Sequence, residues 1–275
     1  MKKFLAVTAA AALIIAAAGC SQGGGEAQTT EQATAAAESD LAYIKDNGVM
    51  KIGYTIINPL NYTDDSGELV GFETEFATAV CEKLGVTPEF HEIDWDSKEM
   101  ELNAGSIDCV WNGLTITPER EETMSISTPY LENRQVLVMK AENEAAYTES
   151  VDGLNVVAEA GSAGNDLVTS DEFFANATYT EVQSQATALI EVESGTADVA
   201  VIDYVMAASS TGEGTDFADL VFVDKGYDSE QYGVAFRQGS DVTAEVNAAI
   251  TELVSDGTLA GIAEKYGLSD LLIAE

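Results

Sequence analysis

Two patterns of apolar and polar positions alternate along the chain from about residue 40 onward. Short apolar runs of strand length, such as KIGYTI from Lys51 and IDCVW from Ile107, are bounded by polar segments. Between them, apolar residues recur at helical spacing, as in the segment from Phe72 to Leu84, which Gly85 follows as a helix stop. Strands that alternate with helices predict an α/β fold with largely parallel sheets.

The alternation continues to the end of the chain. Further strands are predicted at PEFHEI, VLVM, NVVAEA, ADVAVID, LVFVD and YGVAF. Further helices are predicted at KEMELNAG, from near Asn165, at TALIEVESG, and over one long stretch, TAEVNAAITELVSDGTLAGIAEKYG.

One motif occurs twice. AGSIDCVW (104–111) and SGTADVAV (194–201) each run from a helix end through a Gly, two residues and an Asp into a buried strand. The repeat predicts two similar lobes, and a polar residue ends each buried strand, Asn112 in the first lobe and Asp203 in the second. Ligands of open α/β sheets bind at the carboxyl ends of the strands. Two such edges that face each other would form a cleft.

The segment NGLTITPERE carries the first candidate binding group. Thr117 can cap a helix that begins at Pro118, which places Arg120 in the first turn, beside unpaired N–H groups and the positive end of the helix dipole. Gly113 lets backbone approach a ligand, and Thr115 offers a hydroxyl on the same side. This combination is typical of a carboxylate receptor. The alternative is that Arg120 pairs with a neighbouring glutamate on a solvated helix.

Asp203 is the complementary candidate, because a carboxylate at a strand end can accept hydrogen bonds from an ammonium group. Across a cleft from Arg120 it would suit a zwitterion; alternatively, it caps the helix that follows. The Gly-rich turn AEAGSAGND (158–166) offers N–H groups to a carboxylate, or is an ordinary strand–helix loop.

Composition and charge exclude several classes of function. The 275-residue chain has a formal net charge of −36, with 12 Lys and Arg against 48 Asp and Glu, which argues against nucleic-acid binding. Its 46% hydrophobic content suffices for a packed core. His91 is the single histidine, and the sequence has no zinc motif, P-loop or GxGxxG, so we expect no metal and no cofactor. Cys81 and Cys109 lie among apolar residues and are interpreted as buried free thiols.

The N-terminus has the pattern of a targeting segment. Lys2 and Lys3 precede an apolar stretch, residues 4–18, that is too short to span a bilayer comfortably. It ends in AAAGC, which resembles the lipobox of bacterial lipoproteins, with Ala17 in place of the usual Leu and Cys20 as the lipidated residue. We expect a signal peptide over 1–19 and a flexible tether over 20–40, since SQGGGEAQTTEQATAAAES cannot form a core. The alternative is an ordinary secretory signal with a chance Cys.

From about Asp40 to Leu268, the chain resembles the amino-acid-binding proteins of ABC importers, the bacterial extracellular solute-binding family 3. The matching segments, in order, are GELVGFETEFATAVCEKLG, NAGSIDCVWNGLTITPERE, STPY, GTADVAVID, QYGVAF and VNAAITELVSDGTLAGIAEKYG. The resemblance implies a two-lobe periplasmic-binding-protein type II (Venus-flytrap) fold, with two mostly parallel sheets joined by a two-crossing hinge.

The resemblance also implies roles for individual residues. Arg120 would bind the α-carboxylate of the ligand and Asp203 its α-amino group, and Trp95 would pack on its side chain. Further groups expected to line the site are Asn112, Gly113, Thr115, Ser162 and the Ala163 N–H.

The sequence departs from the family in the specificity pocket. An aromatic segment that the family often has after the first strand reads YTIINPLNY here, and the candidates to replace it are Tyr54, Asn61 and Tyr62. Glu159 stands where a Lys or Gln is frequent. Together with a cation–π face on Trp95, Glu159 would favour a cationic ligand side chain.

The implied mechanism places opposite charges on two lobes. Lobe one comprises residues 41–130 and 231–275, and lobe two comprises residues 131–230. The lobes would close over a zwitterion at hinges near 130–135 and 228–232. We expect a non-enzymatic, monomeric protein, held by Cys20 on the outer face of the cell membrane, that binds a free amino acid and delivers it to an ABC permease. Two alternatives are a sensory binding protein for a receptor and a dehydratase-like enzyme on the same fold, for which Glu159 is the candidate acid/base group.

Overall fold

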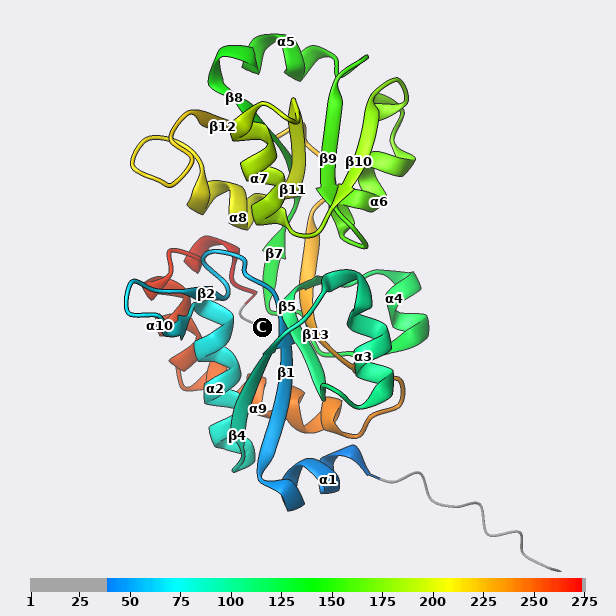
Figure 1. The fold of residues 1–275 in the computed structure, drawn as a ribbon. Coiled ribbons are helices and arrows are strands. Elements are labelled where there is room, and N and C mark those ends of the chain that lie inside the picture. The colour runs from blue at the N-terminus through cyan, green and yellow to red at the C-terminus, as the bar shows by residue number, and fades with distance from the viewer. Residues whose placement is uncertain (1–38, 274–275) are drawn as a thin grey trace, which may run out of the picture. The chain divides into compact units, whose positions relative to one another are not determined.

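The computed structural model describes residues 39–273. Two separate sheets, each with helices on both faces, are joined by two strands that run between them (Figure 1). The expected signal peptide, Cys20 and nearly all of the expected tether lie outside the described residues. We call the first sheet with the elements packed on it lobe 1, and the second sheet with its elements lobe 2.

Lobe 1 is built from two parts of the chain that are far apart in sequence. Its central sheet has the strand order β4-β1-β5-β13-β6, and β7 also pairs with β13. The elements are α1 (Asp40–Asn47), β1 (Val49–Tyr54), β2 (Tyr62–Thr63), β3 (Leu69–Val70), α2 (Phe72–Leu84), β4 (Thr87–Glu92), η1 (Trp95–Ser97), α3 (Lys98–Ala104), β5 (Cys109–Thr115), α4 (Pro118–Thr123), β6 (Met124–Ile126), β7 (Leu131–Asn133), β13 (Glu230–Arg237), α9 (Val242–Ser255), α10 (Thr258–Lys265) and η4 (Ser269–Leu271).

Lobe 2 is a continuous stretch of the chain, and its sheet has the strand order β10-β9-β11-β8-β12. Its elements are β8 (Gln135–Lys140), η2 (Ala141–Asn143), α5 (Glu144–Glu149), β9 (Asn155–Glu159), α6 (Ala163–Ser170), η3 (Glu172–Phe174), β10 (Thr178–Val182), α7 (Gln185–Ser194), β11 (Val199–Asp203), α8 (Tyr204–Ser210) and β12 (Leu220–Val223).

The α/β prediction is confirmed, but the sheets are more mixed than expected. In lobe 1, β4, β1 and β5 are parallel, whereas β13 runs antiparallel to β5. In lobe 2, β10, β9 and β11 are parallel, whereas β8 runs antiparallel to β11. The reversed strands are β13 in lobe 1 and β8 in lobe 2. Each enters its sheet directly from the other lobe, without the helical crossover that a parallel connection requires.

The two segments that connect the lobes are paired with each other. β7 leaves lobe 1 and β13 returns to it, and they form an antiparallel ladder in which Leu131 faces Tyr232 and Asn133 faces Glu230. The connection is therefore a short two-stranded ribbon (Figure 1).

The repeated Gly–x–x–Asp motif has the same structure in both lobes. Gly105 and Gly195 end α3 and α7 in the left-handed conformation. The Asp108 carboxylate then accepts the backbone N–H of Lys51 at 2.9 Å, and the Asp198 carboxylate accepts that of Asn155 at 2.8 Å. Each Asp thereby aligns a neighbouring parallel strand, β1 in lobe 1 and β9 in lobe 2, with the strand that follows the motif.

Alternate side chains of the central strands are buried on opposite faces of each sheet, as in doubly covered α/β sheets. In β5, Cys109 and Trp111 belong to the core beneath α2 and α9, whereas Val110 and Leu114 belong to the core beneath α3. β5 continues past the predicted end at Asn112 to Thr115, because β13 pairs with its last two residues.

One helix prediction is wrong in extent. The long C-terminal stretch forms two helices, α9 and α10, rather than one, because Gly257 adopts φ +82° between them. The two helices pack on each other and on α2.

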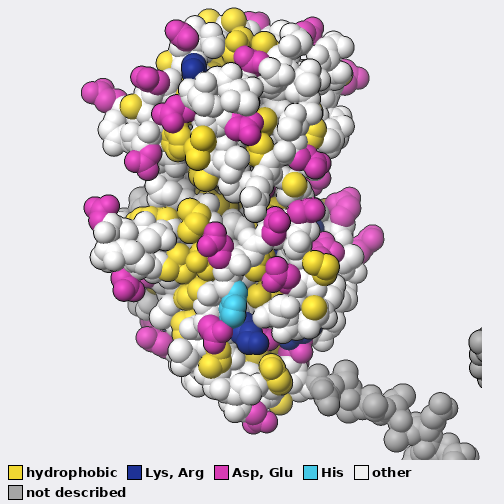
Figure 2. All heavy atoms as spheres, in the orientation of Figure 1, with side chains coloured by type: hydrophobic (Ala, Val, Ile, Leu, Met, Phe, Trp, Pro, Cys, Tyr) yellow, Lys and Arg dark blue, Asp and Glu magenta, His cyan; other side chains and the backbone are white. Residues whose placement is uncertain are grey.

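The surface agrees with the acidic composition. Figure 2 shows Asp and Glu side chains spread over this face of both lobes, with few basic side chains among them. Within residues 39–273, Cys81 and Cys109 are buried free thiols, as predicted. Over the same residues, no helix is long and apolar enough to cross a bilayer, and no cluster of three or more metal-ligating side chains occurs.

Candidate functional site

A narrow cavity between the lobes brings together nine of the ten predicted ligand-binding residues. Its lining residues in lobe 1 are Ile57, Trp95, Asn112, Gly113, Thr115 and Arg120, and those in lobe 2 are Glu159, Ser162, Ala163, Gln185 and Asp203. The space open to the centre of a water-sized sphere is about 10 Å³. The lobes are thus closed on each other, and a ligand must separate them to enter.

Arg120 lies at the lobe 1 side of this cavity. Thr117 caps α4 as predicted, and its hydroxyl accepts the backbone N–H of Arg120 at 3.2 Å. The guanidinium donates to the Thr115 carbonyl oxygen at 2.8 Å and to the Gly161 carbonyl oxygen of lobe 2 at 3.3 Å. Among the described residues it forms no ion pair with a glutamate of its own helix. Burial lowers its pKa, since the charged form is desolvated.

Asp203 ends β11 on the lobe 2 side. It precedes α8, yet its side chain makes no capping bond. Instead its carboxylate accepts amide N–H groups from Asn133 at 2.7 Å, from Gln135 at 2.6 Å, and from Gln185. Burial raises its pKa, and the three amide donors oppose that rise. The carboxylate is therefore held toward the cavity by neutral donors, and it forms no ion pair with a cation of residues 39–273.

Glu230, which sequence analysis did not identify, lies beside Asp203. Its Oε2 accepts from the same two amides, Asn133 and Gln135, each at 3.1 Å, and from the Thr115 hydroxyl at 3.0 Å. Burial, and then the Asp203 charge, raise its pKa to about 7. Its position at the start of β13 places it on the ribbon between the lobes.

Glu159 ends β9 and faces the cavity. Its side chain is 2% exposed, and its Oε1 has no hydrogen-bond partner among the described residues. Burial and the nearby Asp203 charge raise its pKa to about 8, and the Lys98 ammonium acts in the opposite direction. An unpartnered buried carboxylate oxygen is unfavourable on its own, so this atom is available to a donor on a ligand.

Lys98, at the start of α3, is a second cation that sequence analysis missed. It is 6% exposed, and its Nζ donates to the Trp95 carbonyl oxygen at 3.2 Å and to the Gly161 carbonyl oxygen at 3.1 Å. It also lies over the Trp95 ring, 4.7 Å from the ring centre. One face of the Trp95 ring is therefore occupied by a cation of the chain, and the cation–π contact of Trp95 with a ligand stays a prediction.

Two predicted polar groups of lobe 1 are already used within the lobe. The Gly113 N–H donates to the buried Glu73 carboxylate at 2.8 Å. The Asn112 side chain bonds to Thr55, accepting from its hydroxyl at 2.6 Å and donating to its carbonyl oxygen at 2.8 Å. These residues line the cavity, but those groups face inward.

The three candidates for the missing aromatic position do not line the cavity. Tyr54 packs edge to face on Phe90, Asn61 bonds to Glu73 inside lobe 1, and Tyr62 belongs to the β2–β3 hairpin. Ile57 is the lining residue from this segment.

The start of α6 completes the lobe 2 wall. Ser162 caps the helix by accepting the Asn165 N–H at 3.1 Å, and Ala163 is the first helical residue. The helix begins two residues before the predicted point near Asn165. Its first N–H groups lack intrahelical acceptors and adjoin the cavity.

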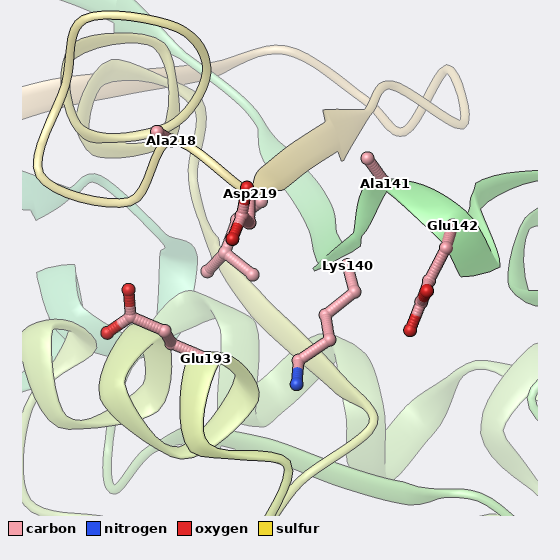
Figure 3. A pocket seen from close by; sticks show the side chains of 7 residues that line it. Lys140, Ala141, Glu142, Glu193, Ala218 and Asp219 are labelled. Carbon is pink, nitrogen blue, oxygen red and sulfur yellow. The ribbon is translucent and has the colours of Figure 1, made fainter.

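A larger hollow lies elsewhere on lobe 2, at the opposite end of its sheet. Figure 3 shows Lys140 extending between Glu142 and the helix that carries Glu193, with Asp219 nearby. Its volume is about 450 Å³. Lys140 pairs with the start of β12, whereas Asp203 at the other end of the sheet pairs with Gln135, so this hollow is separate from the cavity between the lobes.

Comparisons with known proteins agree on one family. Residues 50–269 match the model of bacterial extracellular solute-binding proteins, family 3. The L-cystine-binding protein TcyA of Bacillus subtilis is 32% identical over 242 residues, which cover 84% of this chain and 86% of TcyA.

Two solved structures are similar over most of their length. An ABC uptake transporter substrate-binding protein from Streptococcus pneumoniae, with bound histidine, has a TM-score of 0.77 at 30% identity, covering 83% of this chain and 96% of its own. The ancestral amino acid-binding protein AncCDT-1, a precursor of cyclohexadienyl dehydratase, has a TM-score of 0.75 at 29% identity, covering 83% and 99%.

Proposed function

Because the chain belongs to the bacterial extracellular solute-binding proteins of family 3, we propose that it binds a free amino acid between its lobes and delivers it to an ABC permease. The family and its two-lobe type II periplasmic-binding fold are as the sequence predicted. The observation that carries the proposal is that Arg120 and Asp203, opposite charges from opposite lobes, line one buried cavity.

In this proposal, Arg120 binds the α-carboxylate and Asp203 binds the α-ammonium group. The three neutral amides around Asp203 support this role, because they position the carboxylate without cancelling its charge. Charge-assisted hydrogen bonds contribute about 1.5–3 kcal/mol each. A few of them, less the cost of ordering, suffice for micromolar binding at about −8 kcal/mol.

The ligand selects the closed form because only a molecule with both charges contacts both walls. Cross-lobe contacts that support a closed state are Arg120 to Gly161 and the Ser209 hydroxyl to the Asn58 carbonyl oxygen at 2.7 Å. The hinges of this motion are proposed at 130–135 and 228–232, which include the β7–β13 ribbon, with lobes of 41–130 plus 231–275 and 131–230.

Three finer parts of the proposal concern the setting of the protein. It acts as a monomer on the outer face of the cell membrane, it is anchored there by a lipid on Cys20, and its closed form docks on the permease. The lipobox-like AAAGC supports the anchor. Replacing Cys20 by Ala is expected to move the protein from the membrane fraction to the soluble fraction; retention at the membrane would contradict the anchor.

The binding proposal is tested with the chain from Ser21 onward, refolded and dialysed free of ligand. Calorimetric titration against the common amino acids is expected to give binding for at least one, with none for its α-amide or its decarboxylated amine. Arg120→Lys and Asp203→Asn are each expected to weaken binding by about 10-fold to 150-fold, which corresponds to about 1.5–3 kcal/mol.

Lys140→Met and Asp152→Asn serve as controls, because each removes one charge outside the cavity and neither is expected to weaken binding. Binding that survives both Arg120→Lys and Asp203→Asn at full strength would overturn the assignment of the two charges. Stabilisation by plain carboxylates, and by no α-amino acid, would overturn amino-acid binding itself.

An enzymatic role is the second candidate, favoured by one observation. Glu159 has a pKa raised to about 8 in the cavity, which suits a general acid, and one similar structure is a precursor of a dehydratase. Product formation from a bound carboxylic acid, lost in Glu159→Gln, would support it. A sensory role would show as docking on a receptor in place of a permease.

A further inference from the structure

A second pair of opposite charges lies at the cavity besides Arg120 and Asp203. Glu159 lines the cavity, and Lys98 adjoins it through Trp95 and Gly161. Lys98 comes from lobe 1 and Glu159 from lobe 2, so this pair also spans the two lobes. Both side chains are nearly fully buried, at 6% and 2% exposure. They do not form an ion pair, since no Lys98–Glu159 pair is among the salt bridges of the described residues. Oε1 of Glu159 also has no hydrogen-bond partner there.

Lys98 and Arg120, both of lobe 1, contact the same backbone atom of lobe 2. The Gly161 carbonyl oxygen accepts from Lys98 Nζ at 3.1 Å and from Arg120 Nη2 at 3.3 Å. One neutral oxygen thus receives two cations. An ammonium has three donors, and Lys98 uses two of them on carbonyl oxygens. The third donor suits an anionic oxygen of a ligand.

Glu159 has an acceptor atom that lacks a donor. Its unpartnered oxygen is in the cavity wall, close enough to Lys98 for each charge to act on the pKa of the other. Because burial opposes ionisation of both groups, Glu159 and Lys98 have pKa values of about 8. A ligand that supplies one donor and one acceptor at this place would satisfy both.

A side chain that carries only a positive charge satisfies one member of the pair and is repelled by the other. Lys98 is already over the Trp95 ring, so a ligand cation entering there meets a like charge. An amide side chain can bond to both groups, but it brings no charge of its own to either, which charged partners would provide.

We propose that Lys98 and Glu159 bind the end of the ligand side chain, and that the ligand is a diaminodicarboxylic acid, with an ammonium and a carboxylate group at each end. This inference rests on the proposed function, since Arg120 and Asp203 hold the first end. Lys98 binds the second carboxylate and Glu159 the second ammonium. Lobe 1 thus contributes a cation, and lobe 2 an anion, to each end of the ligand.

The test is calorimetric titration of the ligand-free chain from Ser21 onward, at pH 7.5 and without reductant. The probes are L-cystine and meso-2,6-diaminopimelate, compared with L-arginine, L-lysine, L-histidine and L-glutamine. At least one diaminodicarboxylic acid is expected to bind ten-fold or more tightly than any of the four others.

Variants separate a binding role from a structural one. Lys98→Met is expected to weaken the best diaminodicarboxylic acid ten-fold or more, while L-arginine binds equally or more tightly because a repulsive charge is removed. Lys98→Arg, which keeps the charge, is expected to retain the ligand preference. Glu159→Gln is expected to weaken the diaminodicarboxylic acid ten-fold or more, and Lys140→Met and Glu193→Gln, in the separate hollow of Figure 3, are expected to change nothing.

Three outcomes would overturn the inference. They are tightest binding of a basic amino acid, tightest binding of glutamine, and an equal loss for every ligand in Lys98→Met, which would indicate a merely structural lysine. In the first two cases, loss of that binding in Arg120→Lys would leave the proposed function intact. Absence of binding to all six probes and to all other amino acids would overturn the proposed function as well.

Discussion

Arg120 of lobe 1 donates to the backbone carbonyl oxygen of Gly161 in lobe 2, across the cavity that both lobes line. Gly161 has φ +66°, and a Cβ placed on it would be 3.0 Å from Asp96 Oδ1 and 3.4 Å from Lys98 Nζ, both in lobe 1. The turn therefore approaches the opposite lobe so closely that even a methyl group would touch it.

Gly161→Ala is thus expected to hinder closure. We expect ligand affinity to fall about ten-fold, since every contact at Gly161 must shift, and stability to fall by about 1–2 kcal/mol from the left-handed conformation. Gly153→Ala is the matched control, because Gly153 has φ +75° in the same lobe with nothing within 4 Å of its Cβ. Calorimetry and urea unfolding measure the two effects. Equal affinities of the two variants would contradict a steric role for Gly161 in closure.

Asp198 is expected to contribute to stability without contributing to binding. Its carboxylate accepts the Asn155 N–H at the start of β9, and β9 ends at the cavity. Asp198→Ala should lower the free energy of unfolding by about 1–2 kcal/mol, since a backbone donor loses its partner, and should leave the dissociation constant within about two-fold. Asp152→Ala, which removes an exposed bond to Asn176, should cost less than about 0.5 kcal/mol. Similar losses in urea unfolding for both variants would refute the role of the motif.

The repeated motif also shows how much of this fold is predictable from local sequence. Gly105 and Gly195 end helices, Thr117 caps α4, and Arg120 follows in the first turn, all as their local patterns predict. These features depend on residues within a few positions of each other. The extent of α9 and α10 was less predictable, because apolar spacing continues through the break at Gly257.

The site residues that the sequence did not predict belong to no recognisable local sequence pattern. Lys98 and Gln185 are ordinary polar residues at helix starts, and Glu230 is one of many acidic residues in an acidic chain. Each becomes important only through a residue of a distant segment: Lys98 through Gly161, and Glu230 through the amides it shares with Asp203. The direction of β13 likewise follows from the path of the chain between the lobes and not from its own sequence.

Cys81 and Cys109 are expected to be unreactive in the folded protein. Both are fully buried, and burial raises the pKa of Cys81 to about 12 and that of Cys109 well above its ordinary value. Since the thiolate is the reactive form, a disulfide reagent at pH 8 should titrate no thiol in the native chain from Ser21 onward and two in urea. Rapid reaction of either thiol without denaturant would show that this part of lobe 1 opens readily.

The buried carboxylates of the cavity are expected to make the ligand-free protein less stable as pH rises. Burial raises the pKa of Glu159 to about 8 and that of Glu230 to about 7, and it also raises the pKa of Asp203. In the unfolded chain these groups lose their protons near pH 4. Between about pH 4.5 and 8 the folded state therefore binds more protons than the unfolded state, and the free energy of unfolding falls with rising pH.

Glu159→Gln measures the contribution of Glu159 to this pH dependence of stability. At pH 5 the wild-type Glu159 is protonated in the folded state, so its replacement by a neutral amide should change stability little. At pH 8 the variant should be more stable than the wild type by on the order of 1–3 kcal/mol, because it avoids an ionised buried group. The charged groups that act on Glu159 are Asp203 and Asp94, which oppose its ionisation, and Lys98, which favours it. The Gln185 amide also favours it. Urea unfolding of the ligand-free proteins at pH 5, 6, 7 and 8 measures the difference.

The exposed Glu193→Gln serves as the control for loss of one charge from an acidic chain. If wild type and Glu159→Gln lose stability in parallel over this range, Glu159 is ionised in the folded protein and is compensated by Lys98 without a ligand.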